Sequence, residues 1–224
     1  MTAFRHPKIL ISALVMPLVL MLGSLQAEVT DEDLSGLKLA KETKYLKIYV
    51  RSGVDLSKYK TLHLSNMDVS LDEKWLHDYN RERKSLMYRL NEKDVAKMTE
   101  RYAKKFQQTI SRSLAQKEGM SLVDDIASAD LKVEASIVNL RLYAPDKMTA
   151  SNTTYLVRQV GEAELHTKMY DAKTGELLVA IIDEKETHEY SDLFQTNRVR
   201  NLSEFVRIYK AWAKNWFISL EQQS

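Results

Sequence analysis

The chain has 224 residues, with 33 lysines and arginines, 31 aspartates and glutamates, and no cysteine. Two of the basic residues and none of the acidic ones lie in residues 1–27, so the remaining chain carries 31 charges of each sign. A chain balanced in this way lacks the overall positive field of a nucleic-acid-binding domain. The absence of cysteine excludes thiolate zinc sites, cysteine nucleophiles and a lipid anchor on an N-terminal cysteine. We therefore expect no nucleic-acid partner and no lipid anchor.

The N-terminus has the features of a secretory signal peptide. Arg5 and Lys8 precede an apolar run over residues 9–22, and small or permissive residues follow up to Ala27. This run of 14 residues is shorter than the roughly 20 that a membrane-spanning helix requires. We predict that residues 1–27 are a cleavable signal peptide, cut after Ala27, and that the processed protein lies in the periplasm without a transmembrane segment. An uncleaved signal anchor is the alternative.

Residues 45–224 are expected to form a single domain. The segment 28–44 is polar, charged and weakly periodic, which predicts an N-terminal arm outside the core. A β-rich run at 45–50 ends in a turn, and a second strand is expected at 61–69. Residues 72–90 are highly charged with isolated apolar anchors, which suggests a loop containing a helical turn.

Two amphipathic helices are predicted. In the first, apolar residues recur at intervals of three and four, with Asn91 as an N-cap and Gly119 beyond the C-terminal end. The second helix is expected to begin near Asn201 or Ser203 and to place its two tryptophans in the core. The apolar stripe of the first helix consists of Val95, Met98, Tyr102, Phe106, Ile110 and Leu114.

Strands are predicted on either side of the 171–175 turn and before it. Residues 131–142 alternate between apolar and polar and then shift by one position, which predicts a bulge near Asn139. Counting outward from the turn pairs Leu165 with Ile181 in a β-hairpin. The order of elements predicts an α+β fold, with a two-layer arrangement of a mostly antiparallel sheet and two amphipathic helices on one face.

The stretch from Tyr49 to Lys60, YVRSGVDLSKYK, resembles the hallmark of a bacterial family, the domain of unknown function 3313 family. Weaker matches are the turn from Tyr170 to Glu176 and the pair Trp212 and Ala213. Members of this family are mostly predicted lipoproteins, so the resemblance implies a protein of the Gram-negative cell envelope, and it implies no activity. The matched residues are interpreted as structural, as turn glycines and core aromatics: Tyr49, Arg51, Gly53, Asp55, Leu56, Tyr59, Gly175 and Trp212.

One group of residues has the composition of a metal or hydrolase site. His166 lies two residues from Glu164 on a predicted strand, and the partner strand ends in Glu184, Glu186 and His188. The pairing counted from the turn places His166 opposite an alanine, so the side chains would not converge. A solvent-exposed strand face is the favoured interpretation, and we predict no metal ligands.

A second group is a basic stripe on the first predicted helix, on the side away from its apolar residues. Such a stripe usually faces solvent, although it is also suited to an anionic partner such as lipopolysaccharide, a glycan or an acidic protein. The stripe consists of Lys93, Lys97, Arg101, Lys104, Lys105 and Arg112.

No nucleophile elbow, phosphate-binding glycine loop or HExxH pair is present in the sequence. We therefore assign no catalytic residue and no cofactor. The favoured hypothesis is a non-enzymatic accessory or binding module of the bacterial envelope, whose partner is an envelope protein or an anionic envelope component. A periplasmic hydrolase or metal-dependent enzyme using the face around His166 is the alternative.

Overall fold

The computed structural model of the chain describes residues 28–65, 67–145 and 155–221. In these residues an eight-stranded sheet has the order β1-β2-β9-β8-β6-β3-β5, and β4 pairs with β6. Its strands are β1 (Leu37–Glu42), β2 (Leu46–Arg51), β3 (Thr61–Leu64), β4 (Asp68–Leu71), β5 (Ser121–Leu122), β6 (Leu131–Leu142), β8 (Gly161–Asp171) and β9 (Leu177–Glu186). A separate two-stranded sheet pairs β7 (Tyr155–Val157) with β10 (Phe194–Thr196).

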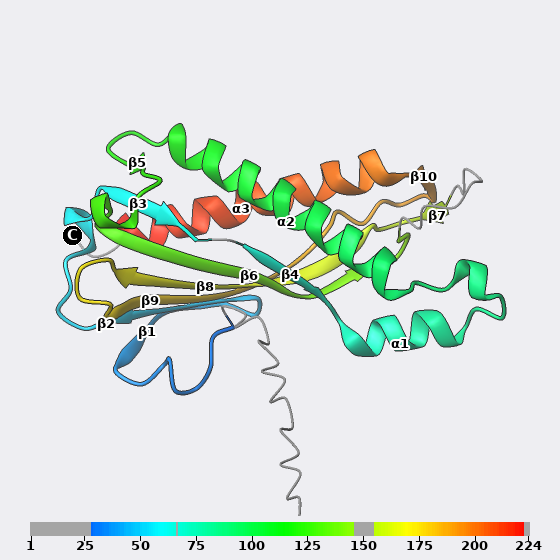
Figure 1. The fold of residues 1–224 in the computed structure, drawn as a ribbon, viewed down its shortest axis with the longest axis horizontal. Helices are drawn as coiled ribbons and strands as arrows, with labels where there is room; N and C mark the ends of the chain where they lie inside the picture. Colours follow the sequence, from blue (N-terminus) through cyan, green and yellow to red (C-terminus); the bar gives the residue numbers. More distant parts are fainter. Residues whose placement is uncertain (1–27, 66, 146–154, 222–224) are drawn as a thin grey trace, which may run out of the picture.

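The long helices α2 (Glu92–Ala115) and α3 (Arg198–Glu221) cover one face of the large sheet (Figure 1). Most strand pairs are antiparallel, and the pairs β3–β5, β3–β6 and β4–β6 are parallel. The predicted α+β fold, with a mostly antiparallel sheet and two amphipathic helices on one face, is therefore confirmed. Short 3-10 helices are η1 (Leu56–Lys58), η2 (Leu86–Tyr88) and η3 (Ile126–Ser128).

Both helix starts are explained by side-chain caps. Asn91 accepts a hydrogen bond from the Asp94 N–H, and Asp94 accepts one from the Asn91 N–H, so α2 begins with a capping box. The Asn197 side chain accepts from the Arg200 N–H, and α3 begins at Arg198 rather than at the residues predicted. The sequence pattern missed this cap because the apolar periodicity becomes visible only further along the helix.

The core lies between the two long helices and the sheet. The ring centroids of Phe106 and Tyr209 are 5.1 Å apart, and Phe106 and Trp212 meet edge to face at 5.8 Å. Tyr102 and Phe205 make a similar contact at 5.2 Å. These large rings are fully buried or nearly so, and together they join α2 to α3 above the sheet.

A third helix, α1 (Glu73–Arg81), occupies part of the segment that was expected to be a loop with a helical turn. Asp72 caps it, because its carboxylate accepts a hydrogen bond of 2.6 Å from the Trp75 N–H. Its apolar residues Trp75, Leu76 and Tyr79 have helical spacing, but the segment is too short and too charged for its periodicity to identify a helix.

The segment 28–44, expected to be an arm, contains the edge strand β1, which pairs antiparallel with β2. Its side chains are half-buried or exposed, and the pairing shifts between Leu39 and Lys41. The polar composition of this segment therefore reflects a strand at the edge of the sheet rather than an arm outside the core. A bulge and lysines at such an edge discourage pairing with other chains.

The predicted bulge near Asn139 is present, with a φ of 53° at that residue and a register shift between Val138 and Arg141. The predicted hairpin register was wrong by two residues, since Leu165 lies opposite Asp183. The two residues of the error have separate causes. Asp171 bonds to Glu176, which makes the loop one residue shorter than predicted, and an irregularity on β9 shifts the register by one residue more. Because the error is even, the same residues still face the helices.

Candidate functional site

Six of the family-hallmark residues lie together at one end of the sheet, a region we call the hallmark corner: Arg51, Gly53, Asp55, Leu56, Tyr59 and Gly175. The Tyr59 hydroxyl donates to Asp171 at 2.9 Å, and Asp171 also accepts from the N–H groups of Lys173 and Thr174 in the hairpin turn. Burial, followed by the bond to Asp171, raises the pKa of Tyr59 to about 12. A pocket of about 320 Å³ lies beside these residues, but its carboxylates are already engaged by protein donors.

The other hallmark residues also make contacts within the fold. Arg51 donates to the Leu177 carbonyl at 2.7 Å, and Asp55 caps η1 by accepting from the Ser57 N–H. Gly53 and Gly175 have φ values of 77° and 73°, which an L side chain rarely adopts. Leu56 and Trp212 are buried, and Tyr49 is half-buried on β2.

The basic stripe forms one face of α2. At about 100° per residue, its six cations fall within an arc of about 120°, while the buried residues of the helix occupy the opposite side. Arg101 and Lys105 are half-buried, and the other four are exposed. Asp94 is the acid in this arc, and the capping box holds it. The arrangement concentrates positive charge on a surface of an otherwise balanced chain, and we call this surface the basic face.

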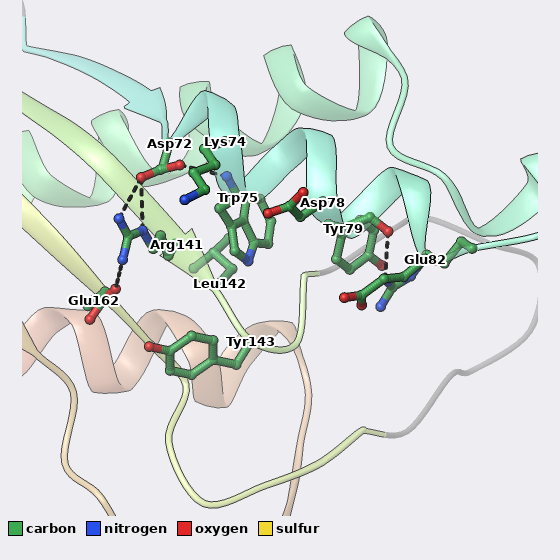
Figure 2. A pocket seen from close by; sticks show the side chains of 11 residues that line it. Asp72, Lys74, Trp75, Asp78, Tyr79, Glu82, Arg141, Leu142, Tyr143 and Glu162 are labelled. Carbon is green, nitrogen blue, oxygen red and sulfur yellow. Dashed lines mark hydrogen bonds and ion pairs between the residues drawn. The ribbon is translucent and has the colours of Figure 1, made fainter.

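A groove of about 450 Å³ opens between α1 and the end of β6, lined by acids, cations and aromatic rings (Figure 2). At its base Arg141 donates to Asp72 through Nε and Nη2, at 2.9 and 2.7 Å, and to Glu162 through Nη1 at 2.6 Å. Trp75 and Tyr143 lie on opposite sides of it. These residues come from segments far apart in the sequence, so no local pattern could have predicted the groove.

The charges at the base of the groove hold α1 against the sheet. Burial opposes ionisation of Asp72, but hydrogen bonds from Trp75 and Arg141 outweigh it and hold its pKa below the ordinary value. Burial and the neighbouring Glu162 raise the pKa of Tyr143. Because Arg141 already binds two carboxylates, its guanidinium is engaged within the protein, and the groove offers a ligand aromatic surface together with the charged side chains of Lys74 and Glu82.

Replacing Arg141 with methionine is expected to lower the free energy of unfolding by about 1–2 kcal/mol, since two largely buried carboxylates lose their partner. The value lies below that of a fully buried pair because the arginine is 44% exposed. Urea unfolding at neutral pH measures it. Arg81→Met is the control, because Arg81 pairs with Asp78 on the surface and should change stability by less than about 0.5 kcal/mol. Equal losses in the two variants would contradict the role of Arg141.

His166 does not lie on a solvent-exposed strand face, as the sequence suggested, but is 6% exposed. Its Nδ1 accepts a hydrogen bond of 2.9 Å from the Val29 N–H, so the proton is on Nε2, which donates to Glu164 at 2.8 Å. That bond, together with one from Asn139, lowers the pKa of Glu164. The N-terminal residues cover this face, and both ring nitrogens are occupied.

The observed strand register also gives His166 different neighbours from those that the sequence predicted. It lies opposite Ile182, and Glu164 lies opposite Glu184. His188 is exposed and packs edge to face on Tyr190 at 4.5 Å. Within the described ranges, no group of three or more His, Cys, Asp or Glu residues is placed to hold a metal ion. The observed contacts therefore favour a structural role for His166.

Asp183 is the strongly buried carboxylate of β9. Its side chain is fully inaccessible, and it accepts from Asn215 at 2.5 Å and lies 2.9 Å from the Lys185 ammonium. Burial raises the pKa of Asp183 above its ordinary value, although the contacts with Lys185 and Asn215 act in the opposite direction. Since it faces α3 inside the core, we assign it to the packing between α3 and the sheet.

The part of the chain that the structure describes holds no helix both long and apolar enough to cross a membrane. Among solved structures, a DUF4136 family protein from Bacteroides thetaiotaomicron is 12% identical with a TM-score of 0.39, over 80% of this chain and 98% of that one. A PelC dodecamer from Paraburkholderia phytofirmans is 8% identical with a TM-score of 0.38, over 79% and 97%. A DUF330 protein from Xanthomonas campestris is 9% identical with a TM-score of 0.38, over 84% and 94%.

Likenesses at these identities and scores carry no inference about what this protein does. No curated protein matches the chain. A family model described as "Protein of unknown function (DUF3313)" matches residues 28–216, a range that contains the hallmark corner, the basic face and the groove. The chain therefore belongs to the DUF3313 family.

Proposed function

We propose that the protein is a non-enzymatic binding module of the bacterial cell envelope, exported to the periplasm, which docks through its basic face onto an anionic envelope component. The N-terminal signal pattern supports export, with cleavage after Ala27. The observation that carries the docking proposal is the geometry of α2, where six cations share one side of the helix.

The basic face is suited to recognition by charge. Four of its cations are exposed, and the acid in the same arc is held by the helix cap. The chain after residue 27 is balanced in charge, so this concentration creates a local positive field that can orient an anionic partner. Phosphate and carboxylate groups of envelope glycolipids, glycans or acidic proteins have the complementary charge.

The test is the retention of the processed protein on immobilised heparin, used as a soluble polyanion. We expect the full-length gene, expressed in a Gram-negative host, to yield a periplasmic protein beginning at Glu28. The variant K97E/K104E/R112E, which we call the stripe variant, should bind heparin at least about tenfold more weakly at 0.1 M salt. The reason is that three attractive charges on one helix face become three repulsive ones.

The control is K38E/K60E/K173E, which makes the same change in net charge at exposed lysines outside α2. It should elute close to the wild type, because its lysines are spread over other elements. If the two triple variants elute together, binding depends on net charge alone and the basic face is not a docking surface.

A further inference from the structure

The connection between α1 and α2 exposes three consecutive large apolar side chains. Leu86, Met87 and Tyr88 form η2 and are 76%, 58% and 45% exposed. They lie in residues 81–89, which we call the hook, at the end of the molecule where α1 leads into α2 (Figure 1). Soluble surfaces scatter single apolar residues, so a contiguous group on a protruding turn indicates a surface that contacts something apolar.

The hook is held in place by hydrogen bonds to its backbone. The Asn80 side chain donates to the Leu90 carbonyl at 2.9 Å and accepts from the Leu90 N–H at 2.8 Å, which closes the loop at its base. Inside the loop, Arg89 donates to the Arg83 carbonyl at 2.9 Å. Ser85 caps η2 by accepting from the Met87 N–H. The apolar side chains are thus displayed by an ordered turn, which lowers the entropy lost on binding.

The hook is also basic, with four cations and the one acid Glu82, and of the four cations Arg81 is paired with Asp78 of α1. The Arg83 guanidinium lies 3.2 Å from the centre of the Tyr79 ring, and Lys84 is exposed beside the apolar group. Further along the chain, the basic face begins at Lys93 on the first turns of α2. Apolar side chains surrounded by cations are the combination that binds the interface of an anionic membrane.

We propose that the hook inserts Leu86, Met87 and Tyr88 into the interfacial region of an anionic phospholipid membrane. The two aliphatic side chains would enter the boundary of the acyl chains, and the tyrosine would place its hydroxyl among the headgroups. The exposed Lys84, and the cations of the basic face that follow along the chain, would contact lipid phosphates. The anionic component of the proposed function would then be a lipid surface. The contribution of α2 to membrane binding rests on the proposed function, whereas the contribution of the hook does not.

The probe is a set of vesicles made of phosphatidylglycerol with phosphatidylcholine, compared with phosphatidylcholine alone, and the measurement is the fraction of processed protein that co-sediments. The wild type should bind the anionic vesicles. The variant L86S/M87S should bind them at least about tenfold more weakly, because both side chains lose their apolar contact with lipid. The control L39S/I126S removes two exposed apolar residues from other elements and should bind as the wild type does.

Salt separates the two contributions. Raising the ionic strength should weaken the binding of the wild type without abolishing it and should reduce the deficit of the stripe variant, while the deficit of L86S/M87S relative to the wild type should persist. Its thermal unfolding should match that of the wild type, since both mutated side chains are exposed.

Equal vesicle binding by L86S/M87S and the wild type would overturn the proposal for the hook and leave the heparin result of the basic face intact. The proposal would also be overturned if the wild type were retained on heparin but did not bind anionic vesicles. A wild-type dimer that L86S/M87S converts to a monomer without any effect on vesicle binding would overturn it as well, since a second copy of the chain would then cover the hook.

Discussion

Replacing Gly161 with alanine is expected to prevent stable folding, or to cost more than about 4 kcal/mol, because an added Cβ would lie 2.1 Å from the Arg141 carbonyl oxygen. The next nearest atoms are also backbone, in Arg141 and Leu142, so no flexible side chain can move aside. Gly161 begins β8 opposite Leu142, and both its N–H and its carbonyl bond the Thr187 hydroxyl. Urea unfolding, or the yield of soluble protein, measures the effect.

Gly175→Ala is the matched control, because Gly175 has a φ of 73° but an added Cβ would meet no atom within 4 Å. Its cost should be that of a left-handed conformation, about 1–2 kcal/mol. If Gly161→Ala were no more damaging than Gly175→Ala, the strands would not approach as closely as the structure shows.

Trp212→Ala is expected to lower the free energy of unfolding by about 3–5 kcal/mol. The indole is fully buried and contacts the rings of Phe106 and Tyr209, so its removal leaves a cavity at the junction of α2, α3 and the sheet. Trp212→Phe should recover part of the loss, because it keeps an aromatic ring in the same layer.

The comparison for this variant is Trp75→Ala, which removes a half-buried indole from α1 and should cost clearly less. Chemical denaturation followed by far-ultraviolet circular dichroism detects both losses without depending on tryptophan fluorescence. Similar losses at the two positions would show that the packing between α2 and α3 does not dominate stability.

The two long helices, the bulge in β6 and the faces of the hairpin could be predicted because each depends on a local period in the sequence. The register of the hairpin could not, since it depends on how the turn closes at Asp171 and on an irregularity in β9. β1 was missed for a different reason: its side chains do not alternate in burial, and only its pairing with β2 defines it as a strand.

For the candidate site, sequence alone identified the basic face, because helical spacing determines which side chains share a side of α2. It could not identify the groove, where Arg141 meets Asp72 across 69 positions of the chain. The hook was missed because apolar residues usually predict burial, and only the structure shows that Leu86 and Met87 point away from the core.

The most direct test of docking through the basic face is the distribution of the protein in cells of its own host. When the outer membrane is opened gently at low salt and the soluble periplasmic contents are separated from the envelope, we expect the wild type and K38E/K60E/K173E to remain with the envelope fraction. The stripe variant should be released with the soluble periplasmic contents, and added salt should weaken the retention of the other two. If the stripe variant stays with the envelope as the wild type does, α2 is not the surface that binds it.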